Sequence, residues 1–195
     1  MTLKVAINGF GRIGRSVLRS IFEYNHNDME IVAINDLTEL NTIVHLLKYD
    51  SVHGRFNGSV EPVDGGIKVN NKFIRITAIR EPENLPWDDI DVAMECTGFF
   101  TKKADAKKLI SAGANKVLIS APGTDVDKTI VFGVNDELLT SNDLIVSNGS
   151  CTTNCLAPIA KVLNDLAGIR SGYMTTIHAY TGDQALHDGD HKDLY

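Results

Sequence analysis

The chain has 195 residues, of which 43% are hydrophobic and 23% are charged, values typical of a folded globular protein and unlike those of disordered chains. Its formal net charge of −6 argues against a surface that follows a polyphosphate, so we expect no nucleic-acid partner. The N-terminal apolar run is broken at Asn8 and Gly9 and is too short for a signal segment or a membrane span, so we expect a cytoplasmic protein without a membrane partner.

Apolar, β-rich runs alternate with amphipathic helical patterns along most of the chain. Strands are predicted at 4–8, 30–36, 91–98, 116–122, 128–134 and 143–148, and helices at 12–24, 38–49 and 102–113. Thr38 is the expected N-cap of the second helix. The glycine-punctuated segment 57–80 predicts a hairpin followed by a strand. Buried strands separated by helices predict an α/β fold, with a doubly wound parallel sheet covered on both faces.

The pattern changes near residue 150. Residues 152–168 predict a helix that tolerates Pro158 near its start, residues 171–184 predict a strand from their period-two alternation, and 185–195 form a polar tail. About 45 residues are too few for an independent core. We therefore expect one domain over 1–150 and, over 151–195, the start of a second domain that is truncated.

The stretch "NGFGRIG" places Gly9, Gly11 and Gly14 between a predicted strand and a predicted helix. In this spacing the first glycine makes the turn, the second lets the backbone approach a pyrophosphate, and the third allows close helix packing, while the helix N-terminus faces the anion. The motif in this βαβ context predicts a dinucleotide site.

Asp36 ends the next predicted strand, about 20 residues further along, where a carboxylate accepts from ribose hydroxyls. A carboxylate there also repels a 2′-phosphate, which favours NAD over NADP. Arg12 lies inside the turn and is expected on the phosphate side. The alternative is a glycine-rich turn that binds nothing, with Asp36 serving only to cap the following helix.

Cys151 is expected at the first or second position of its helix, where unpaired amides and the helix dipole favour the thiolate. Ser150 and Thr152 can cap that helix or donate to a bound oxyanion. His178 can pair with Cys151 if the following strand returns beside the helix start. The alternative is a buried structural cysteine and a structural histidine.

The other two cysteines are Cys96 and Cys155, and Cys155 is expected to pack inward. Three cysteines without a secretory context indicate reduced thiols, and the CxxxC pair has no partner at metal spacing, so we expect no metal site.

The motifs "INGFGRIGR", "VAIND", "KYDSVHGRF", "ECTGFF", "SNGSCTTNC" and "TTIHAYTGDQ", in this order, closely resemble the phosphorylating glyceraldehyde-3-phosphate dehydrogenase family over nearly the whole chain. The resemblance implies a Rossmann NAD-binding domain over 1–150 and the beginning of an α+β catalytic domain over 151–195. It also implies a glycolytic oxidoreductase that is usually a homotetramer.

In that family, the cysteine matching Cys151 attacks glyceraldehyde 3-phosphate to give a hemithioacetal, hydride passes to NAD, and inorganic phosphate releases the acyl group as 1,3-bisphosphoglycerate. The histidine matching His178 deprotonates the thiol and stabilises the oxyanion. Substrate and phosphate contacts are implied for Ser150, Thr152 and Thr181. Contacts along the NAD groove, besides the three glycines, are implied for Arg12, Ile13, Asp36, Arg80, Gly98 and Ser120.

Family members continue past the position of Tyr195 and supply from there an arginine, an asparagine and further hydroxyls. We therefore expect a fragment that is inactive alone and still able to hold NAD. Two alternatives remain open. An erythrose-4-phosphate dehydrogenase has similar N-terminal motifs but lacks the threonine matching Thr181, which favours the three-carbon substrate here. A catalytically silent NAD-binding or thiol-sensing module would need a self-sufficient fold after residue 150.

Overall fold

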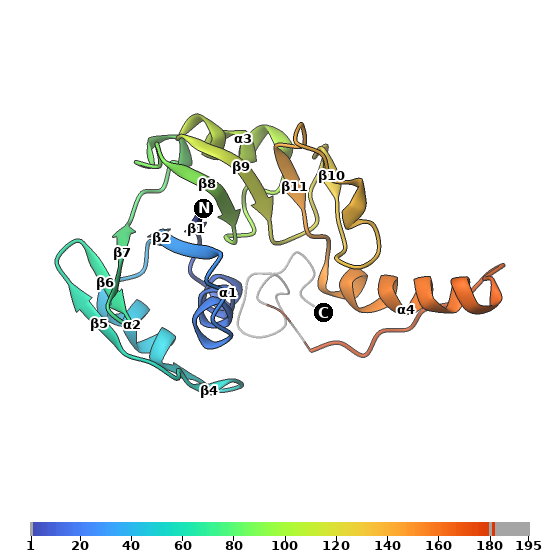
Figure 1. Ribbon diagram of the computed structural model, residues 1–195, viewed down its shortest axis with the longest axis horizontal. Helices are drawn as coiled ribbons and strands as arrows, with labels where there is room; N and C mark the ends of the chain where they lie inside the picture. Colours follow the sequence, from blue (N-terminus) through green and yellow to red (C-terminus); the bar gives the residue numbers. More distant parts are fainter. Residues whose placement is uncertain (1, 180, 182–195) are drawn as a thin grey trace, which may run out of the picture.

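The computed structural model describes residues 2–179 and 181, and within them nine strands form one sheet (Figure 1). These strands are β1 (Leu3–Asn8), β2 (Met29–Asn35), β5 (Val60–Val63), β6 (Gly66–Val69), β7 (Lys72–Thr77), β8 (Ile90–Glu95), β9 (Ala114–Ile119), β10 (Lys128–Thr129) and β11 (Ile145–Ser147). A separate ribbon pairs β3 (Tyr49–Asp50) with β4 (Gly54–Arg55). The helices are α1 (Arg12–Glu23), α2 (Leu40–Lys48), α3 (Lys103–Ser111) and α4 (Cys151–Ala167), with short 3-10 turns at Pro82–Asn84 and Asp136–Leu138.

The sheet has the order β10-β11-β9-β8-β1-β2-β7-β6-β5. Every pair from β10 to β7 is parallel, and β7, β6 and β5 continue the sheet as antiparallel hairpins. The predicted α/β fold with a doubly wound parallel sheet is confirmed, and segment 57–80 forms the predicted hairpin, β5–β6, followed by strand β7.

Both faces of the sheet are covered because alternate residues of a strand point to opposite sides. On β1, Val5 and Ile7 pack in one core cluster with Leu18 of α1, while Ala6 belongs to a second cluster with Leu109 of α3. A strand whose two faces are both buried is apolar along its whole length. The continuous apolar runs in the sequence therefore identified the central strands.

Two predictions about secondary structure are wrong. The N-cap of α2 is Glu39 rather than Thr38, whose amide instead donates to Asp36 Oδ1 at 2.9 Å. Residues 171–179 and 181 form no strand although their sequence alternates. A strand needs a neighbour for its backbone hydrogen bonds, and no strand among the described residues pairs with this segment.

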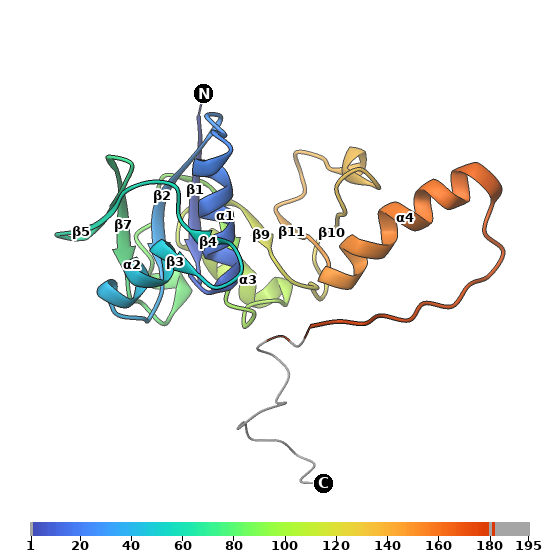
Figure 2. The same ribbon diagram turned by 90° about the horizontal axis from the view of Figure 1, so that it is seen from below.

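The predicted helix after residue 150 is confirmed as α4, which includes Pro158 and projects away from the sheet (Figures 1 and 2). None of its residues is buried, and its apolar side chains are exposed, including Leu156, Ile159, Val162, Leu163 and Leu166. Cys155 is also exposed, so the expectation that it packs inward is wrong: nothing among the described residues covers this helix.

Among the described helices, none combines the length and apolarity that crossing a bilayer requires. The predicted polar tail over 185–195 lies outside the described residues.

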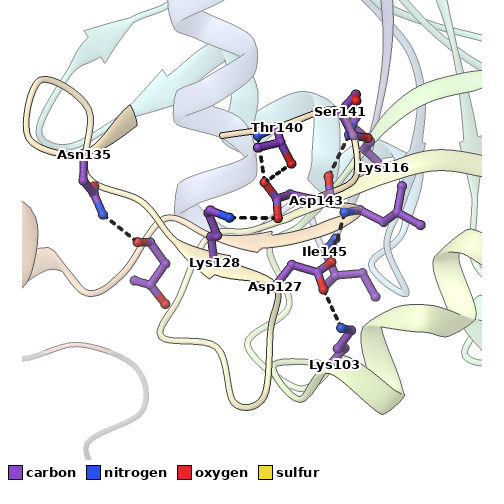
Figure 3. Close-up of polar contacts among 11 residues, drawn as sticks. Lys103, Lys116, Asp127, Lys128, Asn135, Thr140, Ser141, Asp143 and Ile145 are labelled. Carbon is purple, nitrogen blue, oxygen red and sulfur yellow. Dashed lines mark hydrogen bonds and ion pairs between the residues drawn. The ribbon is translucent and has the colours of Figure 1, made fainter. Parts of the chain in front are cut away.

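Two aspartates tie together the edge of the sheet that precedes α4 (Figure 3). Asp127 Oδ2 accepts from the amides of Leu144 and Ile145, both at 2.9 Å, and its other oxygen pairs with Lys103. Asp143 Oδ2 accepts from the Thr140 amide at 2.7 Å. The Lys103 ammonium and the Ile145 amide lower the pKa of Asp127 to about 2.

We predict that Asp127→Ala lowers the free energy of unfolding by about 1–3 kcal/mol at pH 7, because the amides of Leu144 and Ile145, at the start of β11, lose their acceptor. The pKa of Asp127 is lower in the folded chain than the ordinary value near 4, so its stabilisation is full above that value and is lost as the pH falls toward 2. The difference between variant and wild type should therefore shrink over this range in urea titrations.

The matched control is Asp165→Ala on α4, where the carboxylate is exposed and its ion-pair partner among the described residues is Lys161 at i,i+4. This change should stay within about 0.5 kcal/mol of wild type. Equal losses in both variants would contradict the role given to Asp127.

Candidate active site

A groove of about 410 Å³ opens where β1, β2 and β8 end. It is lined by Asn8, Gly9, Gly11, Asn35, Asp36, Leu37, Ile79, Arg80, Cys96, Thr97, Phe99 and Phe100. The carboxyl ends of parallel strands meet at one edge of a sheet, which is where ligands of open α/β folds bind.

The three motif glycines meet three different requirements. Gly9 has φ of +90°, and a Cβ there would lie 2.7 Å from the Thr97 amide nitrogen. A Cβ on Gly14 would lie 2.4 Å from the Gly9 carbonyl oxygen. Gly11 is different, because a Cβ there would meet no atom within 4 Å and its φ is an ordinary −70°. Packing requires glycine at positions 9 and 14, whereas glycine at 11 keeps the groove open for close approach by a ligand.

The carboxylate of Asp36 is hydrogen-bonded to the backbone of the glycine turn. Its Oδ2 accepts from the Phe10 amide at 2.6 Å and its Oδ1 from the Thr38 amide at 2.9 Å. Burial alone would raise the pKa of Asp36, but the hydrogen bonds from Thr38 and Phe10 hold that pKa below its usual value. A charged carboxylate therefore lines the groove, and these features fit the ribose and pyrophosphate of a dinucleotide.

The other residues expected along the groove take different places. Arg80 lines it, as expected. Arg12 opens α1, but its guanidinium donates two hydrogen bonds to the Asp50 carboxylate, at 2.8 and 3.1 Å. Ile13 is half exposed on the first turn of α1, and Gly98 has φ of +77°. Ser120 follows β9, and its hydroxyl hydrogen-bonds the Cys96 thiol on the groove floor.

Cys96 is the unreactive thiol of the chain. Burial raises its pKa to about 11, although the hydrogen bond with Ser120 opposes the shift. Since the thiolate is the nucleophile, Cys96 is inert at neutral pH.

Cys151 is the first residue of α4, as predicted. Ser150 is the N-cap and its Oγ accepts from the Thr153 amide at 3.0 Å. Because Ser150 satisfies that amide, the helix begins at a defined residue and the cysteine lies in the first turn, beside the positive end of the helix dipole. Cys151 is exposed, so its sulfur is accessible to a substrate.

Cys151 Sγ lies 3.0 Å from Nε2 of His178. This hydrogen bond is the largest influence on the thiol and lowers its pKa, and the amide and hydroxyl of Thr152 act in the same direction. The imidazole is oriented by a contact of its Nδ1 with the Ala179 carbonyl oxygen. A thiol with a base in contact and donors beside it is an activated nucleophile.

The structure brings predicted site residues together in two separate places: along the groove, and at the contact between Cys151 and His178. Among the described residues, neither Cys151 nor His178 lines the groove. Thr181 is exposed three residues beyond His178. No group of three or more His, Cys, Asp or Glu side chains among the described residues could hold a metal ion.

Sequence reasoning missed the residues beneath the groove. Asn8, Asn35 and Glu95 are all nearly fully buried and hydrogen-bonded to one another. A signal was present, because each is the polar last residue of a strand that is otherwise mostly apolar. Asp50, the partner of Arg12, had no comparable signal because it comes from a distant ribbon.

Comparisons with known proteins agree with this arrangement. Residues 3–103 match the family model described as glyceraldehyde 3-phosphate dehydrogenase, NAD binding domain, and residues 150–195 match the C-terminal domain of the same family. Similar curated proteins named glyceraldehyde-3-phosphate dehydrogenase come from Cereibacter sphaeroides, 58% identical over 195 residues, and Xanthobacter flavus, 57% identical over 197 residues, both covering 100% of this chain. A third, from Clostridium pasteurianum, is 57% identical over 97% of the chain. The chain spans 59%, 59% and 57% of the length of these relatives.

We predict that His178→Asn slows alkylation of Cys151 by iodoacetamide about tenfold or more at pH 7. Removing the imidazole contact raises the pKa of Cys151, and one pKa unit changes the thiolate fraction tenfold at a pH below the pKa. The pH profile of the rate, followed by mass spectrometry, should move to higher pH.

The control is His45→Asn, since His45 lies in the last turn of α2, where its ring contacts Tyr49 at a tilt of 49°. Its profile should match wild type. Superimposable profiles for wild type and His178→Asn would show that the contact does not activate the thiol.

Proposed function

The chain belongs to the glyceraldehyde-3-phosphate dehydrogenase family, and from that premise we propose that it supplies the NAD-binding domain and the nucleophile of a phosphorylating aldehyde dehydrogenase. The reaction is the oxidation of glyceraldehyde 3-phosphate to 1,3-bisphosphoglycerate with NAD and inorganic phosphate. The 3.0 Å contact between Cys151 Sγ and His178 Nε2, at the first turn of a helix, carries the proposal.

We place the domain boundary at residue 150. The NAD-binding domain covers 1–150, and residues 151–195 begin the catalytic domain. Two observations support this division: the buried core clusters lie in residues 5–145, and α4 contributes no buried residue. The assembly proposed from the family resemblance is a homotetramer in the cytoplasm.

The cofactor groove is proposed to hold NAD with its pyrophosphate over Gly9, Gly11 and the first turn of α1. Asp36 would accept from the adenosine ribose, and Arg80 lies on the same wall. Arg12, Ile13, Gly14, Gly98 and Ser120 are not among the residues that line the groove, and their contacts with NAD are proposed from the family resemblance. When bound, the nicotinamide supplies the hydride acceptor for aldehyde oxidation.

The thiol chemistry follows from the contacts of Cys151. His178 takes the thiol proton through Nε2, and the thiolate adds to the aldehyde carbon to form a hemithioacetal. The imidazolium then faces the new oxyanion and donates to it, a preorganised stabilisation of the kind worth several kcal/mol. After oxidation to the thioester, an oxygen of inorganic phosphate attacks the acyl carbon and Cys151 leaves as the thiolate.

The hydroxyl groups near the sulfur complete the proposed site. Thr152 donates to the sulfur by its amide and hydroxyl, which keeps the leaving thiolate stable. Ser150, Thr152 and Thr181 are proposed as contacts of the substrate and the attacking phosphate.

We predict that Asp36→Asn reduces the preference of the chain for NAD over NADP about tenfold, because the repulsion between the Asp36 carboxylate and a 2′-phosphate is removed. Dissociation constants for both dinucleotides, measured by calorimetry, give the ratio. Asp28→Asn, an exposed carboxylate outside the groove, should leave the ratio unchanged. An unchanged ratio in Asp36→Asn would remove Asp36 from cofactor selection.

The proposed activity is tested in a chimera that joins this chain to the part of the Cereibacter sphaeroides relative beyond the matched 59%. We expect the chimera to form NADH with glyceraldehyde 3-phosphate, NAD and phosphate, and Cys151→Ser to abolish the signal. Cys155→Ser, with a second exposed thiol one turn along α4, should retain activity. The 195-residue chain alone should bind NAD without turnover. A chimera that is folded, binds NAD and stays inactive would contradict the proposed function.

A further inference from the structure

Three polar residues are buried side by side under the groove. Asn8, Asn35 and Glu95 are 2%, 5% and 1% exposed and end β1, β2 and β8. The parallel register pairs Asn8 with Asn35 on one side and with Glu95 on the other. Buried polar groups are costly unless hydrogen-bonded, so the partners of these three residues need an explanation.

Their hydrogen bonds form one continuous chain. The Ile79 amide donates to Asn35 Oδ1 at 2.9 Å, and Asn35 Nδ2 donates to Asn8 Oδ1 at 2.8 Å. Asn8 Nδ2 then donates to Glu95 Oε2 at 2.7 Å, and the Thr97 amide donates to Glu95 Oε1 at 2.7 Å. The chain crosses four adjacent strands, from the loop after β7 to the loop after β8.

The direction of this chain is set at both ends by backbone amides, which can only donate. Ile79 makes Asn35 present its oxygen on that side, so Asn35 and then Asn8 must each donate onward with their amide nitrogens. Glu95 therefore meets a donor at each carboxyl oxygen. A carboxylate accepts at both oxygens, whereas a glutamine would turn an NH₂ group toward one of the donors.

The environment of Glu95 agrees with this role. Burial raises the pKa of Glu95, while hydrogen bonds from Thr97 and Asn8 act against that shift. The Thr97 hydroxyl is a further donor to Oε1. The carboxylate is thus held by donors on both sides.

The chain of hydrogen bonds connects the loops that form the groove. Ile79 and Thr97, at its two ends, both line the groove, as do Asn8 and Asn35. Thr97 also contacts the glycine turn, since a Cβ on Gly9 would lie 2.7 Å from the Thr97 nitrogen. A shift of the Thr97 loop would therefore move against the turn that receives the pyrophosphate.

We propose that Glu95 is a positioning residue for the dinucleotide groove: as the terminal acceptor of the Asn35–Asn8–Glu95 chain, it holds the Thr97 loop, the Gly9 turn and the Ile79 loop in the geometry that binds NAD. This inference rests on the proposed cofactor function. Glu95 acts through the loops and does not itself line the groove.

The first test uses Glu95→Gln, Asn8→Asp and the double variant in the 195-residue chain. In Glu95→Gln, the NH₂ group of the introduced glutamine faces another hydrogen-bond donor. This mismatch should weaken NAD binding about 10- to 100-fold. Asn8→Asp sets two carboxylates together and should weaken it at least as much. In the double variant, the introduced aspartate accepts from Asn35 and from the introduced glutamine, whose oxygen still accepts from Thr97. The double variant should bind within about threefold of wild type, the non-additivity expected of groups in one network.

The second test follows amide hydrogen exchange of the same variants without NAD. Glu95→Gln should accelerate exchange of the Thr97 amide and of the Ile79 amide, which lie at the two ends of the hydrogen-bond chain. The double variant should return both exchange rates to the wild-type values. Asp143→Asn is the control, because it alters a buried, hydrogen-bonded carboxylate at the other sheet edge. It should leave both the NAD dissociation constant and these two amides unchanged.

Each outcome decides a separate point. Absence of NAD binding by the wild-type chain would overturn the proposed cofactor function, and the exchange rates would still decide the positioning role. If Glu95→Gln loses thermal stability but keeps wild-type affinity and exchange, Glu95 is only structural and the inference fails. If the double variant binds NAD as weakly as the single variants, the proposed direction of the hydrogen-bond chain is overturned.

If Glu95→Gln does not fold, Thr97→Val decides instead, because it keeps the side-chain shape and removes the hydroxyl, which donates to Glu95 and accepts from the Phe99 amide at 3.0 Å. We expect a several-fold weaker NAD affinity in this variant. Wild-type affinity would overturn the inference.

Discussion

The geometry of the groove depends on one constraint, the parallel register that sets Asn8 between Asn35 and Glu95. It brings the ends of three strands together, so the loops that leave them form one groove. Because the three end residues are polar, buried and mutually hydrogen-bonded, the strand ends cannot slip without leaving donors unpaired. The glycine turn and Asp36 then build on an edge whose geometry is already set.

The thiol side depends on less tertiary structure. Cys151 obtains its environment from the first turn of one helix, from Thr152 beside it and from His178 on an exposed segment. The contrast with Cys96 is instructive, since burial raises the pKa of that thiol and contact with an imidazole lowers the pKa of Cys151. Position, rather than residue type, separates an inert cysteine from a nucleophilic one.

The exposed apolar face of α4 bears on the alternatives for the chain. A self-sufficient module would cover Leu163 and Leu166, which are 53% and 79% exposed here. The family model matched by residues 150–195 and the greater length of the relatives are in keeping with this exposure. A catalytically silent module would need a covered fold after residue 150, and within the described residues α4 has no buried side chain.

Local pattern in the sequence determined the parallel sheet, its helices, the glycine turn and the start of α4, because apolar periodicity, the packing of Gly14 against the Gly9 carbonyl and the Ser150 cap act over a few residues. The same reasoning failed at Thr38, whose amide donates to Asp36, and over 171–179, where no strand among the described residues pairs with the segment. Only the tertiary structure could show that Arg12 meets Asp50, that His178 reaches Cys151, and that Glu95 closes a chain across four strands. These contacts join residues distant in the sequence, and their distances depend on how strands and helices pack rather than on any pattern along the chain.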